Sequence, residues 1–411
     1  MTPPPATPAP KILFTPEFVQ DPYPTYRRLL DEGPLHYVDV SGGAWAVWGV
    51  FSHADCLAAT RDARLSAKRM SRLLFTLTEE EQAEFKELGR MLEMWMIFMD
   101  APEHTRLRKL MNKGFSPAAV EGLRPQVEAV VDRMLEPLKP GGQTDLMRAV
   151  AYPMPVRVIA GMLGVAEELH ANFIEWSESV ATFIGTPDRT AAHARAAQNA
   201  IVALTNCFRQ SVAERRRNKG ADLISLLIDI EADGEVLTEE ELYAQCVGML
   251  FAGHETTRNL IGNGMYTLLQ HPREAAELRE KPEMIRSAVE ELLRYESPVQ
   301  FTARVLKEDI EVCGQPIRKG WTVLGMLGAA NRDPKQFKEP NELSLKRLNN
   351  QHLAFSAGLH FCVGAQLARL EGQIAILNLV QRYPEMKLIG PRAEWASTFG
   401  FRGLKSLPVI M

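Results

Sequence analysis

Apolar side chains recur at helical spacing through the middle of the chain, from residue 105 to about residue 304, with short polar breaks between the periodic stretches. The breaks at 140–142 and 185–187 combine proline and glycine, which is typical of turns between helices. Within this region, residues 243–268 predict one long apolar helix. The pattern as a whole predicts a protein built mainly from α-helices.

Shorter stretches with other patterns flank this helical region. Residues 44–50 alternate enough to predict a strand, and residues 311–322 predict two strands joined by a turn. Residues 331–350 are polar and interrupted by proline, so we expect an irregular segment there. We find no internal repeat and no convincing linker. The fold class is therefore expected to be mainly α with a small β portion, with residues 21–411 as a single domain.

The first 20 residues are expected to form a disordered, proline-rich lead-in. The chain opens with MTPPPATPAP, which contains no apolar run and predicts neither a signal peptide nor a membrane anchor. Hydrophobic residues make up 46% and charged residues 24% of the 411 residues, the balance of a globular protein. The net charge of −4 offers no basic excess to meet phosphates, so we expect no nucleic-acid partner.

The five cysteines are widely spaced and form no C-x-x-C pair, which excludes c-type haem attachment and the common zinc motifs. This usage fits a reducing compartment, and we expect a cytoplasmic protein. One of the five, Cys362, lies in the stretch FSAGLHFCVGA over 355–365, directly before helix formers over 365–377. At a helix N-terminus, unpaired N–H groups and partial positive charge favour a thiolate. Cys362 is thus a candidate nucleophile or metal ligand, unless it is a buried structural cysteine.

The stretch around Cys362 resembles the haem-binding loop of the cytochrome P-450 family. The family pattern Phe-x-x-Gly-x-His-x-Cys-x-Gly is met by Phe355, Gly358, His360, Cys362 and Gly364. Ser356 departs from the pattern, because many members carry glycine there. The resemblance implies heme b with the Cys362 thiolate as the axial iron ligand. It also implies that Phe355 and Gly364 contact the cofactor and that His360 lies near a haem propionate.

A second match lies inside the long apolar helix. The run Ala252-Gly253-His254-Glu255-Thr256 resembles the family's oxygen-binding motif. Glycine and threonine are unfavourable inside a helix, and such misfits often mark function, although Thr256 could simply hydrogen-bond back to the carbonyl of Ala252. The resemblance implies that Ala252 and Gly253 border the haem and that Gly253 leaves room for dioxygen. It also implies that Glu255 and Thr256 deliver protons.

Three further cationic residues match positions at which the family holds the haem propionates, which need cationic partners when they are buried. His104 and Arg108 are an i,i+4 pair on one helix, and Arg304 lies in an expected strand. Glu291 and Arg294 form an i,i+3 pair that the resemblance assigns a structural role, holding the irregular segment before the cysteine loop. Without the resemblance, both the three cationic residues and the pair on the helix could be ordinary surface charges.

Substrate contacts are expected from apolar side chains near these motifs. A methionine-rich cluster precedes His104, and core packing is the simpler interpretation of such a cluster. The family's loop at this place often lines the substrate pocket. Candidates from this cluster and from later segments are Met94, Trp95, Phe98, Leu250, Phe251, Val299, Phe301, Thr398 and Phe399.

The resemblance runs from about residue 21 to the end and implies the cytochrome P-450 fold, with the haem buried between the oxygen-binding helix and the cysteine-loop helix. It implies a soluble bacterial-type monooxygenase that uses O2 and a separate ferredoxin or flavodoxin-type electron donor with its reductase. The substrate would be apolar: a lipid, steroid, terpenoid or polyketide-like molecule. Arg106, Lys109 and Lys113 are candidates for docking an acidic ferredoxin. The alternatives are a peroxide-using haem-thiolate peroxygenase and a non-catalytic haem sensor.

Overall fold

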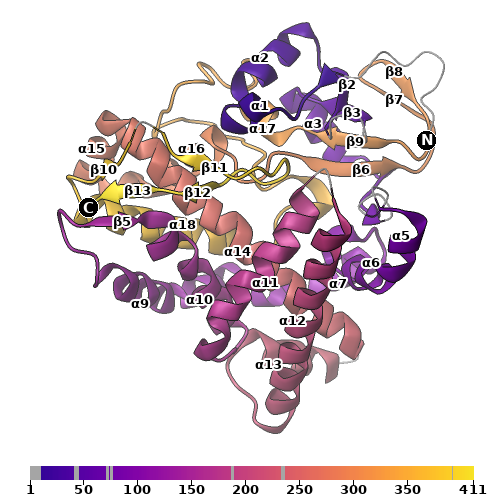
Figure 1. The fold of residues 1–411 in the computed structure, drawn as a ribbon, viewed down its shortest axis with the longest axis horizontal. Coiled ribbons are helices and arrows are strands. Elements are labelled where there is room, and N and C mark those ends of the chain that lie inside the picture. The colour runs from indigo at the N-terminus through magenta and orange to yellow at the C-terminus, as the bar shows by residue number, and fades with distance from the viewer. Residues whose placement is uncertain are drawn as a thin grey trace.

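The structure, a computed structural model, describes residues 11–40, 46–70, 74, 77–186, 189–232, 237–390 and 392–411. Helices fill most of the region between residues 79 and 295, as the hydrophobic pattern predicts (Figure 1). The helices are α1 (Pro16–Gln20), α2 (Tyr23–Glu32), α3 (His53–Arg61), α5 (Glu79–Glu84), α6 (Lys86–Glu93), α7 (Glu103–Gly114), α8 (Pro117–Gly122), α9 (Arg124–Leu135), α10 (Pro153–Met162), α11 (His170–Gly185), α12 (Ala191–Arg217), α13 (Leu223–Ala232), α14 (Glu239–Gln270), α15 (Pro272–Glu280), α16 (Ile285–Tyr295), α17 (Leu327–Ala330) and α18 (Ala365–Arg382).

The largest sheet joins strands from both ends of the sequence, in the order β1-β2-β3-β9-β6-β4. In Figure 1 it lies at the upper right, apart from most of the helices. The prediction of a strand at 44–50 is confirmed over 46–50, and the predicted pair within 311–322 is the hairpin β7–β8. The strands are β1 (Lys11–Ile12), β2 (Leu35–Asp39), β3 (Ala46–Val50), β4 (Leu65–Ser66), β5 (Gln143–Asp145), β6 (Thr302–Leu306), β7 (Ile310–Val312), β8 (Gln315–Ile317), β9 (Thr322–Gly325), β10 (Lys387–Leu388), β11 (Glu394–Trp395), β12 (Leu404–Ser406) and β13 (Pro408–Ile410).

The expectation of a disordered lead-in over residues 1–20 needs correction in its second half. Residues 1–10 lie outside the described part of the chain, but residues 11–20 contribute strand β1 and helix α1. Thr15 caps α1 by accepting a hydrogen bond from the N–H of Phe18 at 3.2 Å, and the buried Phe18 ring meets Tyr26 edge-on. The proline-rich composition therefore concealed a capped helix with an aromatic contact to the core.

Helix α14 crosses the interior and packs against α10, α11, α12, α16 and α18 (Figure 1). It is the predicted long apolar helix, but it begins at Glu239 because Thr238 and Glu241 form a capping box there. Residues along most of its length are buried, which explains the nearly continuous apolar pattern. The helix thus forms a wall that runs through the core.

A buried ion pair joins α16 to the irregular segment over 331–350. Glu291 and Arg294 are both fully buried and lie 2.7 Å apart. Arg294 also donates to the carbonyls of Asn331 and Pro340, at 3.0 and 2.8 Å, and Arg347 donates to Glu291. These bonds give a segment without helix or strand a fixed position next to α16 and the loop that follows.

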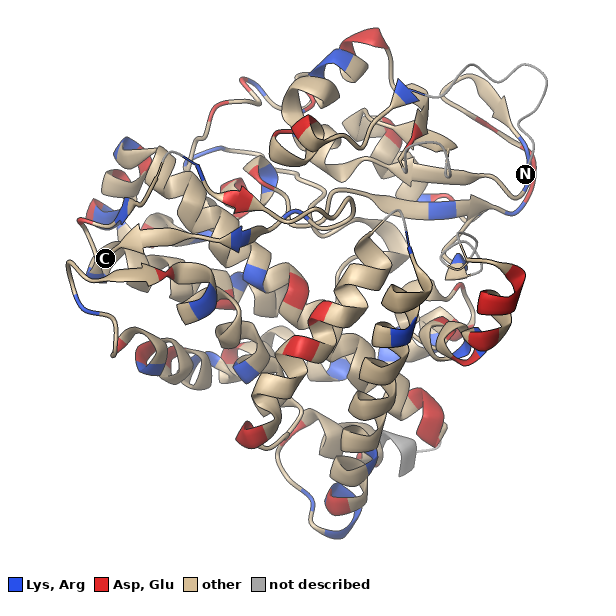
Figure 2. Ribbon diagram, viewed as in Figure 1, with Lys and Arg blue, Asp and Glu red and all other residues tan. Residues whose placement is uncertain are grey.

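Charged residues of both signs are distributed along the helices rather than collected by sign (Figure 2). Within the described residues, we find no helix of the length and hydropathy needed to cross a membrane.

Candidate functional site

A cavity of about 370 Å³ lies between α14 and the loop that precedes α18. Its walls are mostly apolar, and residues of α7, α10, α11 and β6 also contribute to them. Ala252, Gly253 and Thr256 of α14 line it, as do Phe355, His360, Cys362 and Gly364 of the cysteine loop. The structure therefore brings together two motifs that are about a hundred residues apart in the sequence.

Cys362 lies three residues before the first residue of α18, and Gly364 is the N-cap residue of that helix. The backbone N–H of Cys362 donates to the carbonyl of Phe355 at 3.0 Å, which closes the loop. Burial raises the pKa of the Cys362 thiol, whereas the Gly364 N–H and the guanidinium groups of Arg108 and Arg369 lower it. These three positive groups are suited to stabilise a thiolate at this position.

Cationic and imidazole side chains gather at one end of the cavity. The rings of His104 and His360 lie 4.1 Å apart, and Arg108 and Arg304 line the same wall. Burial together with Arg304, His104, Arg69 and Arg108 lowers the pKa of His360 to about 3. Burial is the largest cause of this shift, and the neighbouring positive groups add to it; a bound anion would offset their charge.

Arg69 belongs to this group, although it was not among the residues predicted from the sequence. It donates to the carbonyls of Ala67 and Ile97, at 2.9 and 3.1 Å, and its guanidinium lies 4.5 Å from the centre of the Phe98 ring. Burial and the nearby Arg304 lower its pKa to about 9. The stretch that holds Arg69 has no regular spacing, so no sequence signal could have pointed to it.

The cavity is poor in groups that could neutralise this charge. Glu371 of α18 is the only carboxyl group among its described lining residues, and burial raises its pKa well above the ordinary value. The Nδ1 atom of His104 is buried and has no hydrogen-bond partner among the described residues. The site therefore has an excess of donors and positive charge at one end.

The two polar residues of the α14 motif face different surroundings. Thr256 lines the cavity, and its hydroxyl donates to the carbonyl of Ala252 at 2.8 Å, the local bond that the sequence left open. Glu255 is buried outside the cavity and accepts from Arg258 at 2.9 Å and Asn259 at 3.2 Å. Burial raises the pKa of Glu255 despite these partners.

Arg258 links Glu255 to the surface of the molecule. Its guanidinium also contacts Glu178 of α11 at 3.1 Å, and the Glu178 side chain is 44% exposed. The three residues therefore form a charged connection from solvent to the centre of α14.

Gly253 lines the cavity, but its lack of a side chain matters most for packing. A Cβ atom added there would lie 3.3 Å from Ile159 of α10. Glycine therefore allows α14 and α10 to approach closely at the motif.

Five of the nine predicted substrate contacts line the cavity: Trp95, Phe98, Phe251, Val299 and Phe301. Leu250 does not line the cavity, because it lies on a fully buried face of α14. Its neighbour Phe251 faces the cavity instead. Met94 does not line the cavity either, because its side chain lines a separate, smaller cavity.

Thr398 and Phe399 also lie outside the cavity lining. The Phe399 ring packs on Phe14 and Phe301 in the core beneath the large sheet, and the Thr398 hydroxyl donates to the carbonyl of Phe401. Phe401 lines the cavity in their place and meets Phe251 edge-on. This segment is a turn without regular periodicity, so the sequence did not show which of its side chains line the cavity.

Ile159 and Ile184 line the cavity from α10 and α11 and were not predicted. Their helical periodicity marks them as apolar but does not show what they face. Arg106, a predicted docking residue, pairs with Glu241 in the first turn of α14, so its charge contributes to packing between helices.

The comparisons with known proteins agree with this arrangement. The sequence profile described as Cytochrome P450 matches residues 79–388. The chain is 40% identical over 399 residues to cytochrome P450 monooxygenase PikC of Streptomyces venezuelae, covering 96% of this chain and 92% of that one. It is 37% identical over 398 residues to the biotin biosynthesis cytochrome P450 of Bacillus subtilis, covering 96% and 97%.

Solved structures show the same likeness. The structure of P450BioI in complex with a hexadecenoic acid ligated acyl carrier protein has a TM-score of 0.88 and 37% identity, and covers 96% of this chain and 98% of that one. Tirandamycin C-bound P450 monooxygenase TamI has a TM-score of 0.86 and 35% identity, with 97% and 99% covered. The chain therefore belongs to the cytochrome P450 family, and it is an enzyme of the cytochrome P450 monooxygenase class.

Proposed function

We propose that the cavity holds heme b with the Cys362 thiolate as the axial iron ligand. The donors fit this cofactor: a thiol flanked by positive groups, apolar walls, and a cationic cluster suited to two propionates. His104, Arg108, Arg304, His360 and Arg69 would hold the propionates. When bound, the haem supplies the activation of O2 and the transfer of one oxygen atom to substrate.

The substrate in this proposal is an apolar organic molecule of the lipid, steroid, terpenoid or polyketide type. The rings of Trp95, Phe98, Phe251, Phe301 and Phe401 offer apolar surface and few polar groups for orientation. Two relatives support the class: a vitamin D(3) 25-hydroxylase of Pseudonocardia autotrophica is 38% identical over 97% of this chain and 96% of that one, and a myxobacterial cytochrome P450 was solved with myristic acid.

Electrons in this proposal come from a separate ferredoxin or flavodoxin-type donor with its reductase. Charge complementarity would guide such a donor to the face near Cys362, and Lys113 lies in the last turn of α7, the helix whose Arg108 donates to the carbonyl of Phe361. All five cysteines are free thiols, which supports the cytoplasmic location included in the proposal.

Protons in this proposal pass from Glu255 to the cavity through the Thr256 hydroxyl. Thr256 is the polar residue of the motif that faces the cavity, and burial raises the pKa of Glu255, which favours its part in proton transfer. Arg258 also contacts Glu178, and Glu255 would be reprotonated from that side. The observation that carries the whole proposal is the cavity shared by Cys362, the cationic cluster and Thr256.

Product formation by the reconstituted holoprotein tests the function. Supplied with NADPH, a ferredoxin and its reductase, it should oxidise at least one of myristic acid, vitamin D3 and a macrolactone. Thr256→Ala and Glu255→Gln should each lower the product rate by roughly 10²-fold, since positioned proton transfer contributes about that much. In Thr256→Ala and Glu255→Gln, NADPH should still be consumed without a matching amount of product. Thr256→Ser should retain most of the wild-type product rate.

Two results would contradict the proposal. Product rates in all three variants equal to that of the wild type would exclude the proposed route for protons. Product formed from hydrogen peroxide at the full rate, with none from the donor system, would favour the peroxygenase alternative instead.

A further inference from the structure

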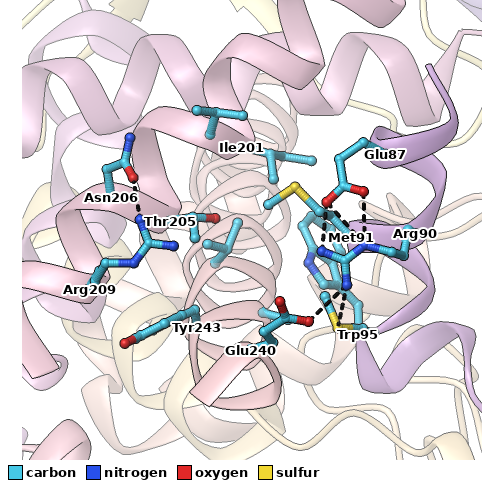
Figure 3. Close-up of a pocket in the computed structure, with 14 residues that line it drawn as sticks. Glu87, Arg90, Met91, Trp95, Ile201, Thr205, Asn206, Arg209, Glu240 and Tyr243 are labelled. Carbon is cyan, nitrogen blue, oxygen red and sulfur yellow. Dashed lines mark hydrogen bonds and ion pairs between the residues drawn. The ribbon is translucent and has the colours of Figure 1, made fainter. Parts of the chain in front are cut away.

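A second cavity, of about 280 Å³, lies between α6, α12 and α14 (Figure 3). It is separate from the cavity that contains Cys362, and the two share only Trp95 as a lining residue. Most of its wall is apolar, built from Met91, Met94, Trp95, Ile201, Val202, Tyr243, Ala244 and Val247. Such a wall favours the hydrocarbon part of a ligand.

Charged side chains lie at two sides of this cavity, and among the described residues only those on one side form ion pairs. On one side, Arg90 contacts Glu87 at 2.6 Å and Glu240 at 2.9 Å, so both carboxylates already have a cation (Figure 3). On the other side, Arg209 of α12 donates to Asn206 at 2.8 Å and lies over the Tyr243 ring. The ion pairs formed among the described residues include no carboxylate partner for Arg209.

Thr205 adds a second donor near Arg209. Its hydroxyl oxygen is buried and has no hydrogen-bond partner within the described part of the chain. Figure 3 shows Thr205 beside Arg209, on the side that faces the cavity. A hydroxyl donor and a guanidinium without a carboxylate partner among the described residues, next to an apolar wall, are the groups that recognise a carboxylate with a hydrocarbon tail.

We propose that this cavity binds a small aliphatic carboxylate at a site distinct from the substrate site. The carboxylate would contact Arg209 and Thr205, and the chain would lie over Met91, Met94 and Trp95. A volume of 280 Å³ equals the space of about nine water molecules, so it holds a ligand of about ten non-hydrogen atoms. A cationic ligand is disfavoured because Arg90 already neutralises Glu87 and Glu240.

Trp95 provides the physical connection between the two cavities. Its indole lies flat against α14, where a Cβ atom on Gly248 would be 3.2 Å away, and its centroid is 5.4 Å from the Phe251 ring. The backbone on both sides of Trp95 is hydrogen-bonded to Gln245. Because Trp95 lines both cavities, a ligand that shifts this ring in the smaller cavity changes the packing that a substrate meets in the larger one.

This connection makes the carboxylate an effector of substrate affinity. Because coupling between two binding equilibria is reciprocal, each ligand must change the affinity of the other by the same factor. The proposal does not depend on which substrate is oxidised or on how protons reach the cavity.

Calorimetry on the holoprotein tests the site with octanoate as the probe. Phenylimidazole, present at saturation as an iron ligand, keeps octanoate out of the larger cavity. One octanoate should bind per chain, and octylammonium should bind at least about fivefold more weakly. Arg209→Gln should weaken octanoate binding about fivefold, in keeping with a partly exposed ion pair, and Thr205→Phe should abolish it by filling the cavity. Arg217→Gln, an exposed arginine on the same helix, is the matched control and should change nothing.

Absorbance titration of phenylimidazole, with and without octanoate, tests the coupling. Octanoate should shift the midpoint in the wild type and leave it unchanged in Thr205→Phe. The proposal is wrong if octanoate does not bind the phenylimidazole complex, or if neither Arg209→Gln nor Thr205→Phe alters that binding. A midpoint that octanoate does not move would contradict the role of Trp95.

Discussion

Ser356 shows how a single residue in the cysteine loop departs from the family pattern at a structural cost. Its φ angle is 58°, in the left-handed region that favours glycine, and its hydroxyl oxygen is buried with no hydrogen-bond partner in the part of the chain that the structure describes. A residue with a Cβ atom there costs about 1–2 kcal/mol, and the flexibility of glycine in the unfolded chain offsets about 0.5–1 kcal/mol of that. The family's preference for glycine at this position thus has a conformational reason.

Substitutions at Ser356 should follow this conformational preference. Ser356→Gly should leave the free energy of unfolding unchanged or raise it by up to about 1 kcal/mol, whereas Ser356→Val should lower it by more than about 1 kcal/mol, since β-branching is poorly tolerated at positive φ. Urea denaturation measures both values. A Val variant as stable as the Gly variant would show that the loop relaxes to another backbone conformation.

At the residue scale, the sequence located side chains well where a motif fixes the spacing. Every predicted cofactor contact lines the cavity, because a short loop and a helix turn set their relative positions. Prediction was poorer where position depends on tertiary packing. Glu255 is turned from the cavity by Arg258, Phe401 takes the place expected of Phe399, and Arg69 carried no signal.

At the scale of elements, two adjacent acids of α16 join the segments that carry the site. Glu291 is fully buried and holds Arg294 and Arg347, and so fixes the irregular segment. Glu290 faces the other way and binds Arg369 of α18 at 2.7 Å and His352 of the loop at 3.2 Å. Helix α16 therefore positions both the loop before Cys362 and the helix after it.

Removing the charge of Glu291 should strongly destabilise the protein. Glu291→Gln leaves two guanidinium groups with no anionic partner at this point, and breaking a buried pair in this way costs about 3–5 kcal/mol. Denaturation in urea should show that loss, whereas Glu283→Gln at an exposed position should change stability by less than about 0.5 kcal/mol. A loss below about 1 kcal/mol for Glu291→Gln would contradict the structural role.

Glu290 should make stability depend on pH in the acid range. Burial opposes its ionisation, but hydrogen bonds from His352 and Arg369 lower its pKa to about 2. A carboxyl with a lowered pKa stabilises the fold above its ordinary pKa of about 4.3, and that stabilisation is lost as pH falls towards 2. Glu290→Gln should therefore lower stability by up to about 3 kcal/mol at pH 7, and the gap to the wild type should narrow between pH 5 and pH 2. A gap that stays constant in denaturant titrations across this range would contradict the assignment.

At the scale of the whole molecule, α14 separates the two cavities that the account depends on. One face of its central turns borders the Cys362 cavity, and an earlier part of the same helix borders the smaller cavity near Arg209. Hydrophobic periodicity predicted this helix and the mainly α character, because both depend on local spacing. The strand order of the large sheet was not predictable, because it pairs segments some 270 residues apart, such as β3 and β9.

The central claim is that Cys362 binds haem iron as a thiolate, and the spectrum of the reduced holoprotein with carbon monoxide tests it most directly. If the Cys362 thiolate holds the haem, the carbon monoxide complex should give a strongly red-shifted Soret band, which Cys362→His should convert to the band of a histidine-ligated haem. A histidine-type band in the wild type, or a red-shifted band that persists in Cys362→His, would contradict the assignment.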